Sequence, residues 1–222
     1  MNPVQLFKQL DELLYEVMSW VIFYPVTLWR AVRRPVTMMD YAESELKDRA
    51  DQQYTDVLGP PLFLLLSVLL AHGVELALIG DSPMIADRHG LAILIDSDTN
   101  LIILRLICFA IFPLTMAVAV LVAQRRKLDR DNLRRPFFAQ CYATAPFALL
   151  FSLGATLSTT AWTWMPLLVM PMILATIIWY LVVQTRWLAR RLPTRWWRAF
   201  GIAFVAYVAA LLALIAISPL FT

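Results

Sequence analysis

Long apolar runs separated by short polar stretches dominate the chain from residue 60 onward. A membrane-spanning helix needs about 20 apolar residues to cross a hydrocarbon core of about 30 Å. Windows of this kind fall at 60–79, 101–123, 137–157, 162–183 and 199–219. The pattern therefore predicts an all-α, polytopic membrane protein whose transmembrane domain, residues 59–222, holds five helices.

The first 58 residues follow a different pattern. From Val4 to Trp20, apolar residues recur at helical spacing, with acidic side chains on the opposite face. The next apolar run, MSWVIFYPVTLW, is only a dozen residues long and is interrupted by Pro25, so it is too short to span. We expect residues 1–58 to form an amphipathic helix and an interfacial helix on the cytoplasmic leaflet. The acidic stretch 40–56 is expected to stand off the membrane.

The short loops predict the orientation, because arginine and lysine are retained on the cytoplasmic side. Residues 124–135 carry six basic residues against two aspartates, and residues 184–198 carry five arginines and no acid. The loops 80–100 and 158–161 lack this excess and are assigned outside. The sequence thus predicts an N-terminus in the cytoplasm and a C-terminus outside, and the compact architecture indicates a bacterial inner membrane.

Composition agrees with a membrane protein, since 60% of the residues are hydrophobic and only 16% are charged, whereas soluble domains carry about 25% charged residues. The net charge of +3 is spread over several stretches, which argues against a nucleic-acid partner. The expected partners are the lipid bilayer and a membrane-protein partner or a second copy of the chain. Both cysteines, Cys108 and Cys141, fall in apolar runs and form no metal-binding or disulfide pattern.

Catalytic patterns are missing from the sequence. It contains no HExxH, GxSxG or P-loop motif, and no pair of carboxylates within a span. Asp96 and Asp98 fall in the loop before the second span. We therefore predict no catalytic, cofactor-binding or metal-binding residues, and we expect the protein not to be an enzyme.

Three ionisable residues lie inside the first two spans, where an uncompensated charge costs a few kcal/mol. They are His72, Glu75 and Arg105. Glu75 and Arg105 lie at similar depth near the external ends of their spans, so one interpretation is an ion pair that joins the two helices. The other is an externally accessible site for a proton or a polar headgroup.

Two further features concern helix geometry. Pro166 and Pro171 lie in one predicted span, as in the broken helices that form transporter sites, although ordinary kinks explain them as well. A patch of small residues in the third span permits close helix approach, within the chain or in a dimer. The patch consists of Ser152, Gly154, Ala155 and Ser158.

The stretch TDVLGPPLFLL marks the entry to the first span. Proline is tolerated in the first turn of a helix, and Asp56 is suited to cap that turn. This stretch also resembles the D-x-x-G-P motif of the Yip family, the Ypt/Rab-interacting membrane proteins, through Asp56, Gly59 and Pro60. CYATAPFALL in the third span is similar to that family's tyrosine and proline pattern, carried by Tyr142 and Pro146.

The resemblance implies a five-span fold with a cytoplasmic N-terminus and a role in membrane organisation or trafficking. Bacterial members of the family are often described as permeases or as proteins of unknown function. Our first hypothesis is therefore a non-enzymatic, Yip-like scaffold or partner of other membrane proteins. The alternative is a small transporter or lipid-handling permease that uses His72, Glu75 and Arg105.

Overall fold

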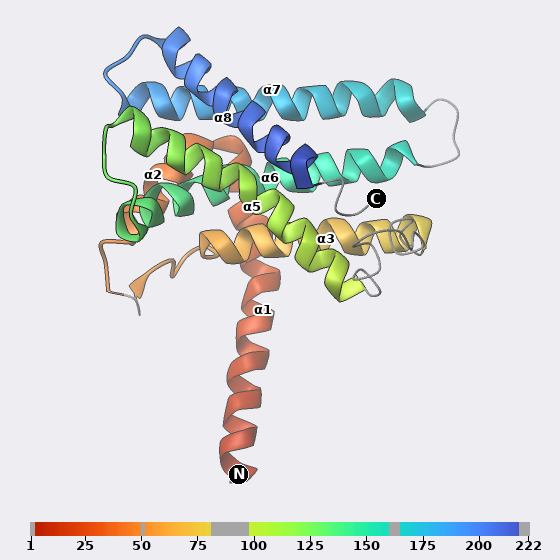
Figure 1. Ribbon diagram of the computed structural model, residues 1–222. Helices are drawn as coiled ribbons and strands as arrows, with labels where there is room; N and C mark the ends of the chain where they lie inside the picture. Colours follow the sequence, from red (N-terminus) through yellow and green to blue (C-terminus); the bar gives the residue numbers. More distant parts are fainter. Residues whose placement is uncertain (1–2, 50–51, 81–97, 160–164, 218–222) are drawn as a thin grey trace.

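The computed structural model describes residues 3–49, 52–80, 98–159 and 165–217, and every regular element in these ranges is a helix (Figure 1). In chain order the helices are α1 (Pro3–Arg33), α2 (Pro35–Glu45), α3 (Pro60–Ile79), α5 (Asp98–Ala123), α6 (Arg130–Ser158), α7 (Met165–Arg191) and α8 (Trp196–Ile217). The loops assigned outside, and the last residues of the fifth predicted span, lie largely beyond the described residues.

Five of these helices, α3, α5, α6, α7 and α8, are long and apolar enough to cross a membrane. The prediction of an all-α fold with five such helices is thus confirmed, and the helices run alternately in opposite directions (Figure 1). α3 begins and ends at the expected residues, whereas α6 begins at Arg130 rather than at 137. Its polar first turns are helical because Asp129 caps them, accepting a 2.8 Å hydrogen bond from the Asn132 amide.

α6 is the central helix of the bundle. Inside the protein, 61% of its apolar stretch is buried, compared with 39% for α3 and less for the other three. α6 contacts α2, α3, α5 and α7. An aromatic cluster fills the core where four helices meet, with the Phe147 and Tyr180 ring centroids 4.6 Å apart and Phe112 and Tyr207 beside them.

Within the small-residue patch on α6, Gly154 is buried and packs within the chain, whereas Ala155 and Ser158 are exposed. A Cβ atom at Gly154 would lie 2.7 Å from Cγ1 of Ile173 on α7, which is closer than two carbon atoms can approach. Gly154 therefore allows α6 and α7 to lie against each other.

The helices continue through their internal prolines. α7 is one helix through Pro171, and Pro166 is its second residue, where the amide needs no partner. Of the two interpretations of these prolines, the broken helix is therefore wrong, and a kink within one continuous helix remains. α1 likewise continues through Pro25, where we expected an interruption. A proline removes a single helical hydrogen bond, and the remaining bonds on both sides keep these helices continuous.

The N-terminal layer, α1 and α2, packs on the bundle. α2 contacts α6 and α7, and it buries Val36, Met38, Met39 and Ala42. Arg191, at the end of α7, forms ion pairs with Asp40 (3.1 Å) and with Glu43. The acidic stretch therefore does not stand free, because basic residues of the bundle compensate its charge. α1 runs crosswise to the spanning helices, and its N-terminal half projects away from them (Figure 1).

Candidate functional site

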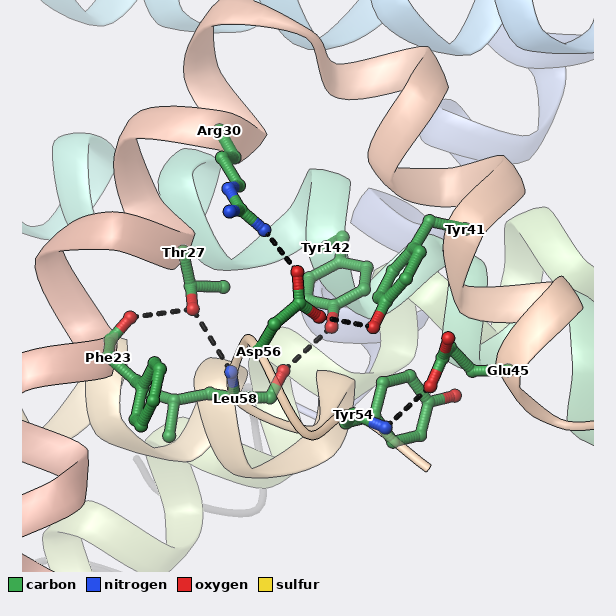
Figure 2. A network of polar contacts seen from close by, with 9 residues as sticks. All are labelled: Phe23, Thr27, Arg30, Tyr41, Glu45, Tyr54, Asp56, Leu58 and Tyr142. Atoms are coloured by element: carbon green, nitrogen blue, oxygen red, sulfur yellow. Dashed lines mark hydrogen bonds and ion pairs between the residues drawn. The ribbon is translucent and has the colours of Figure 1, made fainter. Parts of the chain in front are cut away.

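The residues of the span-entry motif form a junction between the N-terminal layer and the bundle (Figure 2). Asp56 accepts a 2.7 Å hydrogen bond from Arg30 Nη1 on α1 and a 2.6 Å hydrogen bond from the Tyr41 hydroxyl on α2. The N-cap of α3 is Gly59, and no side chain bonds to that helix start. The expected capping role of Asp56 is therefore wrong. Asp56 joins α1 and α2 to the segment that leads into α3.

The peptide groups of Leu58, just before the motif glycine, are bound from two sides (Figure 2). Its amide donates a 3.1 Å hydrogen bond to the Thr27 hydroxyl, which itself donates to the Phe23 carbonyl at 2.7 Å. Its carbonyl accepts a 2.7 Å hydrogen bond from the Tyr142 hydroxyl on α6. The Tyr142 side chain is fully buried. Buried peptide groups without partners are costly, so Thr27 and Tyr142 hold this segment between α1 and α6.

The turn that precedes the motif is held in an unusual conformation. Tyr54 has a φ of 56°, in the left-handed region that residues with a side chain rarely adopt. Its amide donates a 2.6 Å hydrogen bond to Glu45, and its hydroxyl donates a 2.9 Å hydrogen bond to the Ala42 carbonyl. Two contacts with α2 thus compensate the strain at this turn.

Ionisation at the junction favours a charged Asp56 and neutral tyrosines. The hydrogen bonds from Tyr41 and Arg30 lower the pKa of the Asp56 carboxyl below its ordinary value. Burial, followed by the nearby Asp56 and Glu45 carboxylates, raises the pKa of the Tyr41 phenol. Burial and the Glu45 carboxylate raise the pKa of Tyr54 in the same way. The junction is therefore an ordered, charge-assisted contact at neutral pH.

The remaining motif positions have local roles. Pro60 and Pro61 occupy the first turn of α3, as predicted. Gly59 has an ordinary φ of −56°, and a Cβ atom there would meet only Tyr54, at 3.9 Å. Nothing in the backbone requires glycine at this position. Pro146 is buried in α6 and cannot donate to the carbonyl of Tyr142, one turn earlier.

The ionisable residues of the first two spans come together in a second cluster. Arg105 on α5 forms an ion pair with Glu75 on α3, and its Nη1 lies 3.3 Å from His72 Nδ1. The side chains of His72 and Glu75 are only 4% and 8% exposed. Asp98, the first residue of α5, adds a carboxylate 3.4 Å from His72 Nε2. Asp96 lies outside the described residues.

This second cluster joins α3 to α5, as the ion-pair interpretation expected. It also places an imidazole between two carboxylates and a guanidinium, which is a chemically possible proton site. Among the described residues, no three His, Cys, Asp or Glu side chains are arranged to hold a metal ion.

Several polar contacts escaped the sequence analysis. Gln184 on α7 donates a hydrogen bond to Gln140 on α6, and both residues are fully buried. Charge within a span does not identify this pair, because both side chains are uncharged. Arg30 and Tyr41 were also missed as partners of Asp56. The acidic N-terminal stretch and the basic loops were both assigned to the cytoplasmic side. Their opposite charges could have predicted ion pairs between the N-terminal layer and the bundle.

The chain matches no family model, no curated protein and no solved structure. Its function must therefore be argued from its own residues.

Proposed function

We propose that the chain is a non-enzymatic integral membrane protein that acts as a scaffold for other membrane proteins, in the manner of the Yip family. Five apolar helices and the short motifs around Asp56 and Tyr142 support this proposal. The observation that carries it is the largely exposed middle part of α1. We call its residues 11–22 the arm.

The arm exposes a stripe of large apolar side chains. Leu14, Met18 and Val21 are 54%, 62% and 66% exposed, and Leu13 and Val17 lie beside them on the same face. Fully burying one such side chain stabilises a complex by about 1.5–3 kcal/mol. A contiguous exposed stripe of this kind is typical of a surface that binds another protein or a membrane.

The polar face of the arm favours a protein partner. It carries Glu12 and Glu16, both exposed, whereas Asp11 lies one turn before Leu14 at the edge of the apolar stripe. Helices that lie on anionic bilayers carry lysine and arginine on this face, because carboxylates are repelled by anionic lipid. The later part of α1 differs, since Arg33 stacks over the exposed Trp29 ring at 4.5 Å and suits the leaflet surface. We infer that this later part rests on lipid while the arm lies in an apolar groove of a partner with a basic rim.

Site-specific photo-crosslinking in native membranes tests the proposal. A photoreactive residue at Met18 should yield one discrete protein adduct, whereas the same residue at Leu78 of α3, 55% exposed, should react with lipid only. The substitution Leu14→Asp should abolish the Met18 adduct, because it places a charge in the apolar stripe. Purification in mild detergent should recover the same partner in stoichiometric amount, or a homo-oligomer. The proposal is wrong if Met18 gives no protein adduct and neither species is recovered.

The alternative, a small transporter or lipid-handling permease, is favoured by the buried cluster of His72, Glu75 and Arg105, because ionisable groups inside spans commonly mark ion or substrate pathways. Proteoliposomes that contain a pH-sensitive dye test this function directly. A proton flux that depends on the protein and disappears in Glu75→Gln would favour it. Equal fluxes in protein-containing and empty vesicles would exclude proton coupling.

A further inference from the structure

A lateral groove runs along the bundle between α5 and α8. It is a cavity of about 840 Å³, open to the outside of the bundle, within the size range of small-molecule sites. Small residues on both helices create it, notably Ala119, Ala123, Gly201 and Ala209. A Cβ atom at Gly201 would meet no atom within 4 Å, so no neighbouring side chain fills the groove there.

The groove has the length of one lipid leaflet. On α5 it extends from Leu114 to Ala123, and on α8 from Arg198 to Ala209. At 1.5 Å per residue these stretches are about 13 Å and about 16 Å long. Half of a hydrocarbon core is about 15 Å. The groove is therefore about as long as one leaflet of a bilayer is thick.

The two ends of the groove differ in chemistry. Its inner end is apolar, whereas Arg198 and Thr194 lie at its outer end. This outer end is where α5 finishes and α8 begins, beside the basic loop residues 124–127 (Figure 1).

Of the two polar side chains at the outer end, Arg198 is exposed and available to a ligand. The Arg198 guanidinium lies over the Trp197 ring at 5.0 Å, and no carboxylate of the described residues pairs with it. The Thr194 hydroxyl oxygen is buried and has no hydrogen-bond partner within the described ranges. An exposed arginine without a carboxylate partner is suited to binding an anion.

We propose that this lateral groove binds one anionic phospholipid from the leaflet at the basic end of the bundle. An acyl chain lies along the small residues of α5 and α8. The phosphate accepts hydrogen bonds from the exposed Arg198 guanidinium. A free phosphate would leave the apolar length of the groove unused. A zwitterionic headgroup would bring a second cation to a site that is already basic.

Native mass spectrometry of the purified, delipidated chain tests this assignment. The probe is an equimolar mixture of phosphatidylglycerol and phosphatidylcholine with the same oleoyl chains. We expect one phosphatidylglycerol to be retained about fivefold more than phosphatidylcholine, the preference that one arginine near an anionic headgroup provides. Arg198→Gln should remove this preference, and Gly201→Leu should remove the binding of both lipids.

Matched controls separate the groove from general effects on the protein. Arg195→Gln removes a neighbouring arginine that does not line the groove, and Gly73→Leu adds the same side chain at another unobstructed helix position. Both should keep the preference. If Gly201→Leu does not fold, Ala209→Phe fills the inner end of the groove and should also prevent binding.

Two results would overturn the proposal. One is equal retention of both lipids by the wild-type chain, or a preference that survives Arg198→Gln. The other is a wild-type dimer that retains no lipid and dissociates on Gly201→Leu, because a second copy would then occupy the groove.

Discussion

Replacing Asp56 by asparagine distinguishes two roles for the span-entry motif. If Asp56 capped α3, Asp56→Asn would be nearly neutral, because asparagine caps helices as well as aspartate. If Asp56 joins α1 and α2 through its charge, the same substitution removes the ion pair with Arg30 and weakens the hydrogen bond from Tyr41. We expect the second result.

The loss of stability expected for Asp56→Asn follows from the solvent exposure of the Arg30 and Asp56 side chains. The Arg30 and Asp56 side chains are 45% and 54% exposed, so solvent screens their attraction to about 0–1 kcal/mol. A hydrogen bond to a charged group contributes about 1.5–3 kcal/mol. Because the Asp56 carboxylate is half exposed, the hydrogen bond from Tyr41 should contribute no more than the lower value of this range. Asp56→Asn should therefore reduce the free energy of unfolding by about 1–2 kcal/mol.

Thermal unfolding in detergent at neutral pH measures this loss, and limited proteolysis of residues 46–59 reports on the junction itself. Asp11→Asn is the matched control, because Asp11 is exposed on the arm and should have no effect. Tyr41→Phe should be non-additive with Asp56→Asn, since one removes and the other weakens the same hydrogen bond. Equal stability of the wild type, Asp56→Asn and Asp11→Asn would refute the role of the junction.

The pH dependence gives an independent check of the same contact. The pKa of Asp56 is lowered, so its contribution is present above the ordinary value of 3.8 and is lost as the pH falls through the lowered pKa. The pKa of Tyr41 is raised, so its contribution is present below the ordinary value of 10.0 and is lost as the pH rises through the raised pKa. Asp56→Asn should remove the acid-side loss that belongs to this residue. An unchanged acid limb in the variant would contradict the assignment.

Three further substitutions test the packing of the bundle. Glu75→Gln should destabilise the protein by up to about 3 kcal/mol in thermal unfolding, because it leaves the partly buried Arg105 without the Glu75 carboxylate, and Glu75→Gln combined with Arg105→Met should recover much of the loss. Gln184→Leu should cost about 0.6–1.7 kcal/mol in the same assay, since it removes one hydrogen bond between α6 and α7. Gly154→Ala should cost about 1–3 kcal/mol through overpacking against α7, whereas Gly73→Ala, which meets no neighbour, should not destabilise.

The spanning helices could be predicted because hydropathy and proline position act locally. The apolar run and the prolines of its first turn place the start of α3 at Pro60, and the structure begins the helix there. The hydropathy pattern predicted a start of α6 that is too late. The first turns of α6 are polar, and a hydropathy window includes only the apolar part of a helix. The continuity of α1 through Pro25 was missed because a proline's cost is decided by the contacts around it.

The polar contacts were harder to predict because they join residues far apart in the chain. Asp56 is 26 residues from Arg30, and Tyr142 is 84 residues from Leu58. The neighbouring sequence predicted that Asp56 caps the start of α3, and that prediction was wrong. Glu75 and Arg105 were paired correctly because a charge inside an apolar span needs a partner at the same depth. Asp56 lies at the span entry, where water can hydrogen-bond to its carboxylate. Its depth in the membrane therefore does not require a protein partner and does not identify one.

The junction explains why a short motif can position a long helix. Asp56 is bound by α1 and α2, Leu58 is bound by α1 and α6, and Pro60 begins α3, so four helices meet within five residues of sequence. α1 is continuous from the arm to Arg30. Arg30, which binds Asp56, therefore belongs to the same rigid helix as the arm. The direction in which the arm projects then depends on the contacts that hold α1 at the junction, and Asp56 is one of them.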